Sequence, residues 1–146
     1  MVCCCDLVVA AESARFTMAY TRAGLTPDGS SSYFLPRIVG LRRALELTLT
    51  NRFLSAREAE AWGLVTRVVP DGELLPEATA MAGELATGAT GALGAAKRLF
   101  YGGWTETLET QMEQESRTLA AQAVTADGRE GISAFLEKRS PSFKGH

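Results

Sequence analysis

The sequence predicts an α/β protein with its strands in residues 1–70 and an entirely helical part in residues 71–146. Three observations predict this fold class. The first eleven residues form a nearly unbroken apolar run, which is typical of a strand buried on both faces of a parallel sheet. A second strand pattern, rich in β-branched residues, covers 64–69 and is closed by Pro70. Beyond Pro70 the apolar residues recur at helical spacing.

Between the two strand patterns the chain alternates extended and helical segments. We expect a short strand at 15–18, a Gly-, Pro- and Ser-rich loop at 22–32, a helix through 33–35 and another at 41–50, then an extended piece at 52–54. Asp28 is well placed as the N-cap of the first of these helices, and Pro36 would fall in its second turn. Ser55 and Glu58 form a capping box that predicts a short helix ending near Gly63.

Four helices are predicted in the second half, at about 74–86, 92–101, 105–124 and from Asp127 onward. The third carries an apolar stripe along or near one face, made of Leu108, Met112, Leu119 and Val124. The last begins with a sequence that resembles a capping box, formed by Asp127 and Glu130. The predicted division is therefore 1–70 and 71–146.

Composition excludes several classes of function. Fifteen basic and 17 acidic residues give a net charge of −2 with no basic cluster, which argues against nucleic acid as a partner. No apolar run reaches the ~20 residues of a membrane span. The only histidine is His146, so a Ser-His-Asp triad or a multi-histidine metal site would need another chain. The adjacent Cys3, Cys4 and Cys5 are interpreted as small apolar residues of a buried strand in a reducing cytoplasm.

Asp28 is the carboxylate that local sequence singles out, and two interpretations stay open. It is either a helix cap, accepting N–H bonds from the first turn, or a general base that faces a pocket. The second role requires apolar surroundings that raise its pKa, for which Met18, Tyr20, Leu25 and Phe34 are candidates.

Four stretches together resemble the crotonase superfamily, that is, the enoyl-CoA hydratase/isomerase family. They are CDLVVAAESARF (5–16), GLTPDGSSSYFLPRIVG (24–40), LTNRFLSAREAEAWGLVTRVVP (49–70) and DGREGISAFLEKRSPSFKGH (127–146). The resemblance covers nearly the whole chain in the family's order and spacing. It implies the C-terminal part of a ββα-spiral core followed by a helical trimerisation region, acyl-CoA thioesters as substrates, and assembly as a trimer or hexamer. It implies no separate cofactor, because coenzyme A is part of the substrate.

The resemblance also assigns candidate site residues. The second glutamate of the hydratases falls at Tyr20, which disfavours simple hydration. Asp28 matches the aspartate of ring-opening phenylacetate-pathway isomerases, of dienoyl-CoA isomerases and of 4-chlorobenzoyl-CoA dehalogenase. Phe135 and Lys138, three apart on one predicted helical face, match positions near the CoA adenine and phosphates. Core packing and a solvated charge are the alternative interpretations of these two residues.

The resemblance further predicts that a preceding portion of the fold is missing. Both backbone donors of the family's oxyanion hole, and the hydratases' first glutamate, would precede residue 1. This chain alone is therefore expected to be inactive. The leading hypothesis is an isomerase-type double-bond shift with Asp28 as acid and base. Hydratase or dehalogenase chemistry, and a non-catalytic chain that retains only the oligomerisation surface, remain alternatives.

Overall fold

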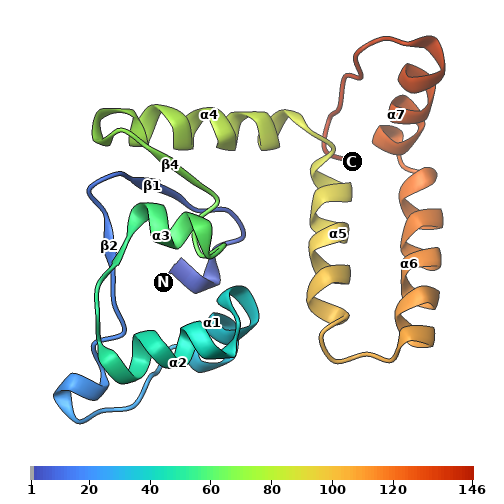
Figure 1. Ribbon diagram of the computed structural model, residues 1–146. Helices are drawn as coiled ribbons and strands as arrows, with labels where there is room; N and C mark the ends of the chain where they lie inside the picture. Colours follow the sequence, from blue (N-terminus) through green and yellow to red (C-terminus); the bar gives the residue numbers. More distant parts are fainter. Residues whose placement is uncertain (1) are drawn as a thin grey trace. The chain divides into compact units, whose positions relative to one another are not determined.

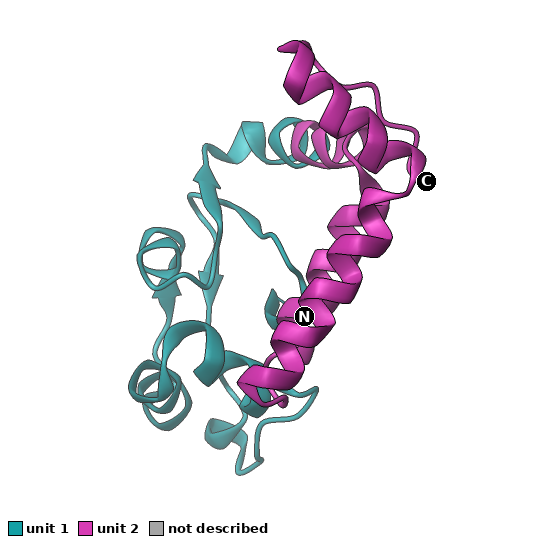
Figure 2. Ribbon diagram, turned by 90° about the vertical axis from the view of Figure 1, so that its right-hand side faces the viewer, with its two compact units in different colours: residues 1–79 teal, residues 80–146 magenta. Residues whose placement is uncertain are grey.

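The computed structural model describes residues 2–146 and divides the chain into two compact units (Figure 2). One unit extends as far as Thr79, and the other is Ala80–His146. The assignment of residues 1–70 to a spiral core and of 71–146 to an oligomerisation region stays a prediction. Within residues 2–146, no helix has both the length and the apolar character needed to cross a bilayer.

The first unit contains a parallel strand pair, β1 (Val9–Ala11) with β4 (Arg67–Val69), in the register Val9↔Arg67 and Ala11↔Val69. The prediction of one buried strand over residues 1–11 is correct only for its last three residues, which form β1, and Met1 lies outside the described residues. Residues Val2–Cys4 form a 3-10 turn, η1, and the side chains of Cys4 and Cys5 are exposed. The strand is shorter than predicted because its partner, β4, lies beside only its last residues. The ladder with β4 begins only at Val8, whose carbonyl accepts from the Thr66 N–H, so the earlier residues have no described strand beside them.

A second, antiparallel pair joins β2 (Arg15–Phe16) to β3 (Leu54–Ser55), so the strands expected at 15–18 and 52–54 are shorter or displaced. Two of the helices match their sequence signals closely. Helix α2 (Leu41–Thr50) has the predicted bounds, and α3 (Ala56–Ala61) begins with the predicted capping box. The Ser55 N–H donates to the Glu58 carboxylate at 3.0 Å and the Glu58 N–H donates to the Ser55 hydroxyl at 3.3 Å. The Ser55 N–H also holds the pKa of Glu58 below its usual value.

The core of the first unit lies where α1 (Ser31–Val39), α2 and α3 meet the short strands (Figure 1). Its largest fully buried side chains are Leu47 of α2 and Leu54 of β3. Small residues at the start and middle of α3, Ala56 and Ala59, let that helix approach closely. These contacts fix the ends of α1 and α2, and hence the loop between β2 and α1 in which the candidate site residues lie.

Helix α4 (Leu74–Thr87) follows the 3-10 turn η3 (Asp71–Glu73). The second unit then contains α5 (Thr90–Gly102), α6 (Leu108–Ala123) and α7 (Ala126–Glu137), with α5 and α6 side by side (Figure 1). All four predicted helices are thus present, with boundaries displaced by up to three residues. The unit buries few side chains: among its described residues those that are buried are Ala95, Asp127 and Ala134.

The predicted start of the last helix at Asp127 is wrong. Thr125 is the N-cap, and its hydroxyl accepts from the Gly128 N–H at 2.9 Å. The Asp127 side chain is instead buried, at 6% exposure, and accepts the N–H groups of Lys144 at 2.7 Å and Gly145 at 2.8 Å. A hydroxyl two residues earlier can reach the first-turn N–H, which leaves the carboxylate available to hold the C-terminal segment.

Glu130 also serves the C-terminal segment rather than a capping box. Its carboxylate accepts two hydrogen bonds from the Arg139 guanidinium, at 2.6 and 2.9 Å, and one from the Ser142 N–H at 2.8 Å. The bonds from Arg139, which have the largest effect, and the bond from Ser142 lower the pKa of Glu130 to about 2. The segment after α7 is therefore held against that helix at two places.

Candidate functional site

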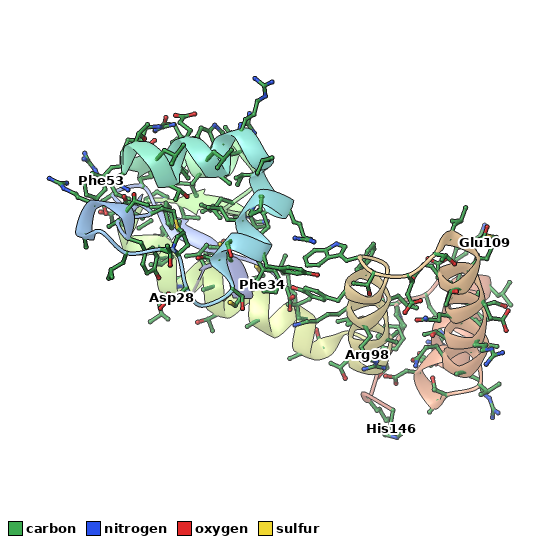
Figure 3. All side chains as sticks on the ribbon, turned by 90° about the horizontal axis from the view of Figure 1, so that it is seen from below. Asp28, Phe34, Phe53, Arg98, Glu109 and His146 are labelled. Atoms are coloured by element: carbon green, nitrogen blue, oxygen red, sulfur yellow. The ribbon has the colours of Figure 1, made fainter. Side chains whose placement is uncertain are left out.

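The loop between β2 and α1 brings the two candidate residues of the first unit together. The Tyr20 hydroxyl donates a hydrogen bond to Oδ1 of Asp28, with 2.5 Å between the oxygens. Tyr20 is half-buried, whereas Asp28 is exposed on the loop leading into α1 (Figure 3). Such a distance is at the short end for an O–H···O⁻ bond, as expected when the acceptor carries a charge.

Backbone hydrogen bonds fix Tyr20 at the start of this loop. Its carbonyl accepts the N–H groups of Ala23 at 2.9 Å and Leu25 at 3.0 Å, which form the 3-10 turn η2 (Thr21–Ala23). Asn51, at the left-handed C-cap of α2, donates its side-chain amide to the Met18 carbonyl at 2.7 Å and to the Thr21 hydroxyl at 2.6 Å. The end of α2 therefore holds the segment that carries Tyr20.

The interpretation of Asp28 as a helix cap is wrong. Helix α1 begins at Ser31, and no side chain caps its first turn. Asp28 contributes only its carbonyl, which accepts the Ser31 N–H at 3.0 Å and the Ser31 hydroxyl at 2.7 Å. Gly29 and Ser30 both have positive φ, 56° and 62°, and this left-handed pair separates the carboxylate from the helix. The carboxylate is thus available to Tyr20.

The described residues do not surround Asp28 with the apolar side chains that a raised pKa would require. Asp28 is exposed and the side chain of Leu25 is 62% exposed, whereas Met18 and Phe34 are half-buried. The neighbour that the sequence did not predict as a partner is Tyr20 itself. A phenol and a carboxylate in one short loop, with a Gly-Leu-Thr-Pro turn between them, is the signal that could have indicated their pairing.

An apolar cavity of about 170 Å³ lies beside this loop. Pro27, directly before Asp28, and Ser31, three residues after it, help to line the cavity, whereas Asp28 and Tyr20 do not line it. Its other lining residues are Met18, Ser32, Leu35, Pro36, Leu41, Ala44, Leu45 and Thr48. An apolar cavity of roughly 150 Å³ is known to hold a molecule of the size of benzene, so this one has room for a small apolar group.

The hydrogen bond between Tyr20 and Asp28 has an electrostatic consequence. The bond to the Asp28 carboxylate, followed by the negative charge of that carboxylate, raises the pKa of Tyr20. The phenol therefore keeps its proton to higher pH than an ordinary tyrosine and remains a hydrogen-bond donor.

Phe135 and Lys138 lie in the second unit and do not share one helical face. Phe135 is in the last turn of α7 and is 81% exposed, so the core interpretation of this residue is wrong. Lys138 follows the end of the helix as its C-cap, in a left-handed conformation with φ 54°. Its N–H donates to the carbonyls of Ala134 and Phe135, and the change of backbone direction takes its side chain out of the helical row.

Comparisons with known proteins agree on the family. The sequence model of the enoyl-CoA hydratase/isomerase family matches residues 1–146. A 1,2-epoxyphenylacetyl-CoA isomerase of Escherichia coli is 44% identical over 96% of this chain and 53% of its own length. A 4-chlorobenzoyl coenzyme A dehalogenase of an Arthrobacter species is 38% identical over 94% of this chain and 50% of its own length.

A solved structure gives the same result for the fold. The crystal structure of an enoyl-CoA hydratase from Polaromonas sp. JS666 superposes with a TM-score of 0.92 and 38% identity, over 97% of this chain and 55% of that one. The architecture is thus a part of the crotonase fold. The chain belongs to the enoyl-CoA hydratase/isomerase family of the crotonase superfamily. It spans about half the length of the curated relatives it matches.

Proposed function

We propose that the protein to which this chain belongs shifts a double bond in an acyl-CoA thioester from the 3,4 to the 2,3 position, with Asp28 as acid and base. The observation that carries the proposal is the carboxylate of Asp28. It is not used as a helix cap, and Tyr20 holds one of its two oxygens. Among the described residues no side chain or backbone group donates a hydrogen bond to its other oxygen, so an exposed carboxylate oxygen remains on a loop whose Pro27 and Ser31 line an apolar cavity.

The reaction balances with one carboxylate. Asp28 takes a proton from C2 of the 3-enoyl thioester, and the electron pair moves onto the thioester oxygen to give a dienolate. The protonated Asp28 then donates to C4, the electrons return, and the carboxylate is restored. The proposal concerns the whole protein, which must also supply hydrogen-bond donors for the enolate oxygen.

The residue at position 20 supports isomerisation over hydration. Adding water to a double bond requires groups that act on the water as well as on the carbon, and the family's hydratases use a second carboxylate here. Tyr20 is a phenol, which is protonated at neutral pH and cannot act as a carboxylate. A single acid–base residue is sufficient for a proton shuttle.

We propose three residues as contacts for the thioester. Tyr20 lies next to the reacting carboxylate, while the exposed ring of Phe135 and the ammonium group of Lys138 are suited to an adenine and to phosphates. The last two are on the second unit, and their assignment rests on the resemblance and on the exposure of Phe135.

Assays of three thioesters with the protein test the proposed function. We expect 3-enoyl-CoA to be converted to 2-enoyl-CoA, with little hydration of 2-enoyl-CoA and little halide release from a 4-halobenzoyl-CoA. If hydration dominates, the protein is a hydratase, like the relative from Polaromonas by its name. If halide release dominates, it is a dehalogenase, like the Arthrobacter relative by its name. No reaction with any thioester would favour a non-catalytic chain.

We further propose that the second unit is an oligomerisation surface, forming a homotrimer or a hexamer. The unit buries no large apolar side chain among its described residues, although α6 and its neighbours carry many. Its large exposed apolar side chains, apart from Phe135, include Leu93, Phe100, Leu108, Met112, Leu119, Val124, Ile132 and Leu136. Helices with an exposed apolar face usually derive their stability from packing that face against a partner. A second copy of the chain would provide such a partner.

Two substitutions on α6 test the oligomerisation surface. Leu119→Glu places a charge on the exposed apolar stripe and is expected to lower the assembled mass in sedimentation. Ala121→Glu adds the same charge about 200° away around the helix and should leave the mass unchanged. A monomeric parent protein, or equal effects of the two substitutions, would contradict the proposal.

The compartment that we propose is the cytoplasm, and the pathway is fatty acid metabolism. The compartment is proposed from the sequence, in which an odd trio of adjacent cysteines does not form a disulfide framework. The pathway follows from the proposed substrate class.

A further inference from the structure

The hydrogen bond between Tyr20 and Asp28 connects two segments that are each fixed independently. On one side, the carbonyl of Tyr20 closes the turn η2. On the other side, the carbonyl of Asp28 accepts both the N–H and the hydroxyl of Ser31 at the start of α1. The 2.5 Å bond is thus formed between two anchored residues rather than between two mobile side chains.

We propose that Tyr20 is a positioning residue, whose hydroxyl holds Oδ1 of Asp28 and thereby presents Oδ2 to the substrate. This inference rests on the proposed function and deepens it. The terminal torsion of an aspartate is broad, so an exposed carboxylate samples many orientations. A hydrogen bond from an anchored phenol restricts that rotation, and fixed orientation is a large part of catalytic efficiency.

The role requires Tyr20 to remain a donor. A phenolate could neither donate to the carboxylate nor tolerate its charge. Asp28 is the charged group that acts on the phenol among the described residues, and its effect keeps the proton on Tyr20 to higher pH. Loss of that proton would release Asp28, so the rate should fall on the alkaline side of the pH profile as Tyr20 ionises.

Tyr20→Phe tests the inference, since it removes only the hydroxyl and keeps the ring. We expect kcat for 3-enoyl-CoA isomerisation to fall by about 10²-fold, the cost of a small misplacement of a catalytic group. KM should change little, and the alkaline limb of the pH profile should disappear. Replacement of Tyr20 by a fluorinated, more acidic tyrosine should restore kcat near neutral pH and move the alkaline limb to lower pH. Tyr33→Phe is the matched control and should leave kcat and the limb unchanged.

A titration of the tyrosine ring carbons by NMR tests the bond without any assay of activity. In the Asp28→Asn variant the pKa of Tyr20 should fall back toward its ordinary value. An unchanged titration would overturn the inference. If Asp28→Asn abolishes turnover while Tyr20→Phe leaves kcat and the pH profile intact, the positioning role is wrong and the proposed function stands. If Asp28→Asn retains full turnover, the proposed function fails, and the positioning role fails with it.

Discussion

Replacing Asp28 by Asn is expected to remove most of the proposed 3-enoyl-CoA isomerisation, with a loss of about 10²–10⁴-fold in kcat. The reason is that Asn has nearly the same shape but cannot accept and return a proton. Its carbonyl oxygen can still accept the bond from Tyr20, so the loop between η2 and α1 should keep its conformation. The rate of 2-enoyl-CoA formation measures the loss, and calorimetry of CoA ester binding shows whether affinity persists.

A second acidic residue serves as the control. Glu73 is an exposed carboxylate of η3 in the same unit, and Glu73→Gln removes one negative charge, as Asp28→Asn does. It should leave turnover unchanged. Equal turnover of the Asp28→Asn variant and the parent protein would contradict the assignment of Asp28 as the acid and base.

Leu47→Ala is expected to lower the free energy of unfolding of the first unit by about 2–5 kcal/mol. Leu47 lies on α2, has 2% of its surface exposed and is among the largest fully buried side chains. Its removal would leave a cavity where α2 packs against the rest of the core, and the same helix holds the Tyr20 segment through Asn51. Urea unfolding followed by circular dichroism measures the change.

Leu49→Ala is the matched control on the same helix. Leu49 has 71% of its surface exposed, so the same chemical change should alter the free energy of unfolding by less than about 0.5 kcal/mol. Equal losses for the two variants would show that the side chain of Leu47 is not buried as described.

The elements that the sequence predicted well are those set by local signals. The capping box of Ser55 and Glu58 needs only residues three apart, and it is present at the start of α3. Helix α2 has a regular apolar pattern bounded by Gly40 and by Asn51, which adopts the left-handed conformation that ends it. Both predictions depended on the chain within a few residues of the element.

The predictions that were wrong depended on partners that the sequence does not specify. The length of β1 is set by where β4 lies beside it, not by the apolar character of residues 1–11. Asp127 resembles a helix cap, yet Thr125 takes that role and the carboxylate binds N–H groups 17 and 18 residues later. Local patterns cannot distinguish a nearby N–H from one that the tertiary fold brings close.

At the candidate site, too, the sequence predicts the residue but not its tertiary partner. The sequence indicates Asp28 as a candidate residue, but sequence alone does not distinguish a helix cap from a general base. The structure separates helix capping from other roles through the conformations of Gly29 and Ser30, which turn the chain between Asp28 and α1. The contact with Tyr20 follows from that turn, and for this reason the pairing was not predicted.

In the proposed reaction the carboxylate of Asp28 faces the carbons between which the double bond moves. A crystal structure of the protein with an unreactive analogue of 3-enoyl-CoA tests this placement. We expect one oxygen of Asp28 at about 3–3.5 Å from C2 and within reach of C4, with Tyr20 on the other oxygen. A bound acyl group with Asp28 directed away from it, or with another carboxylate next to C2, would rule out Asp28 as the acid and base.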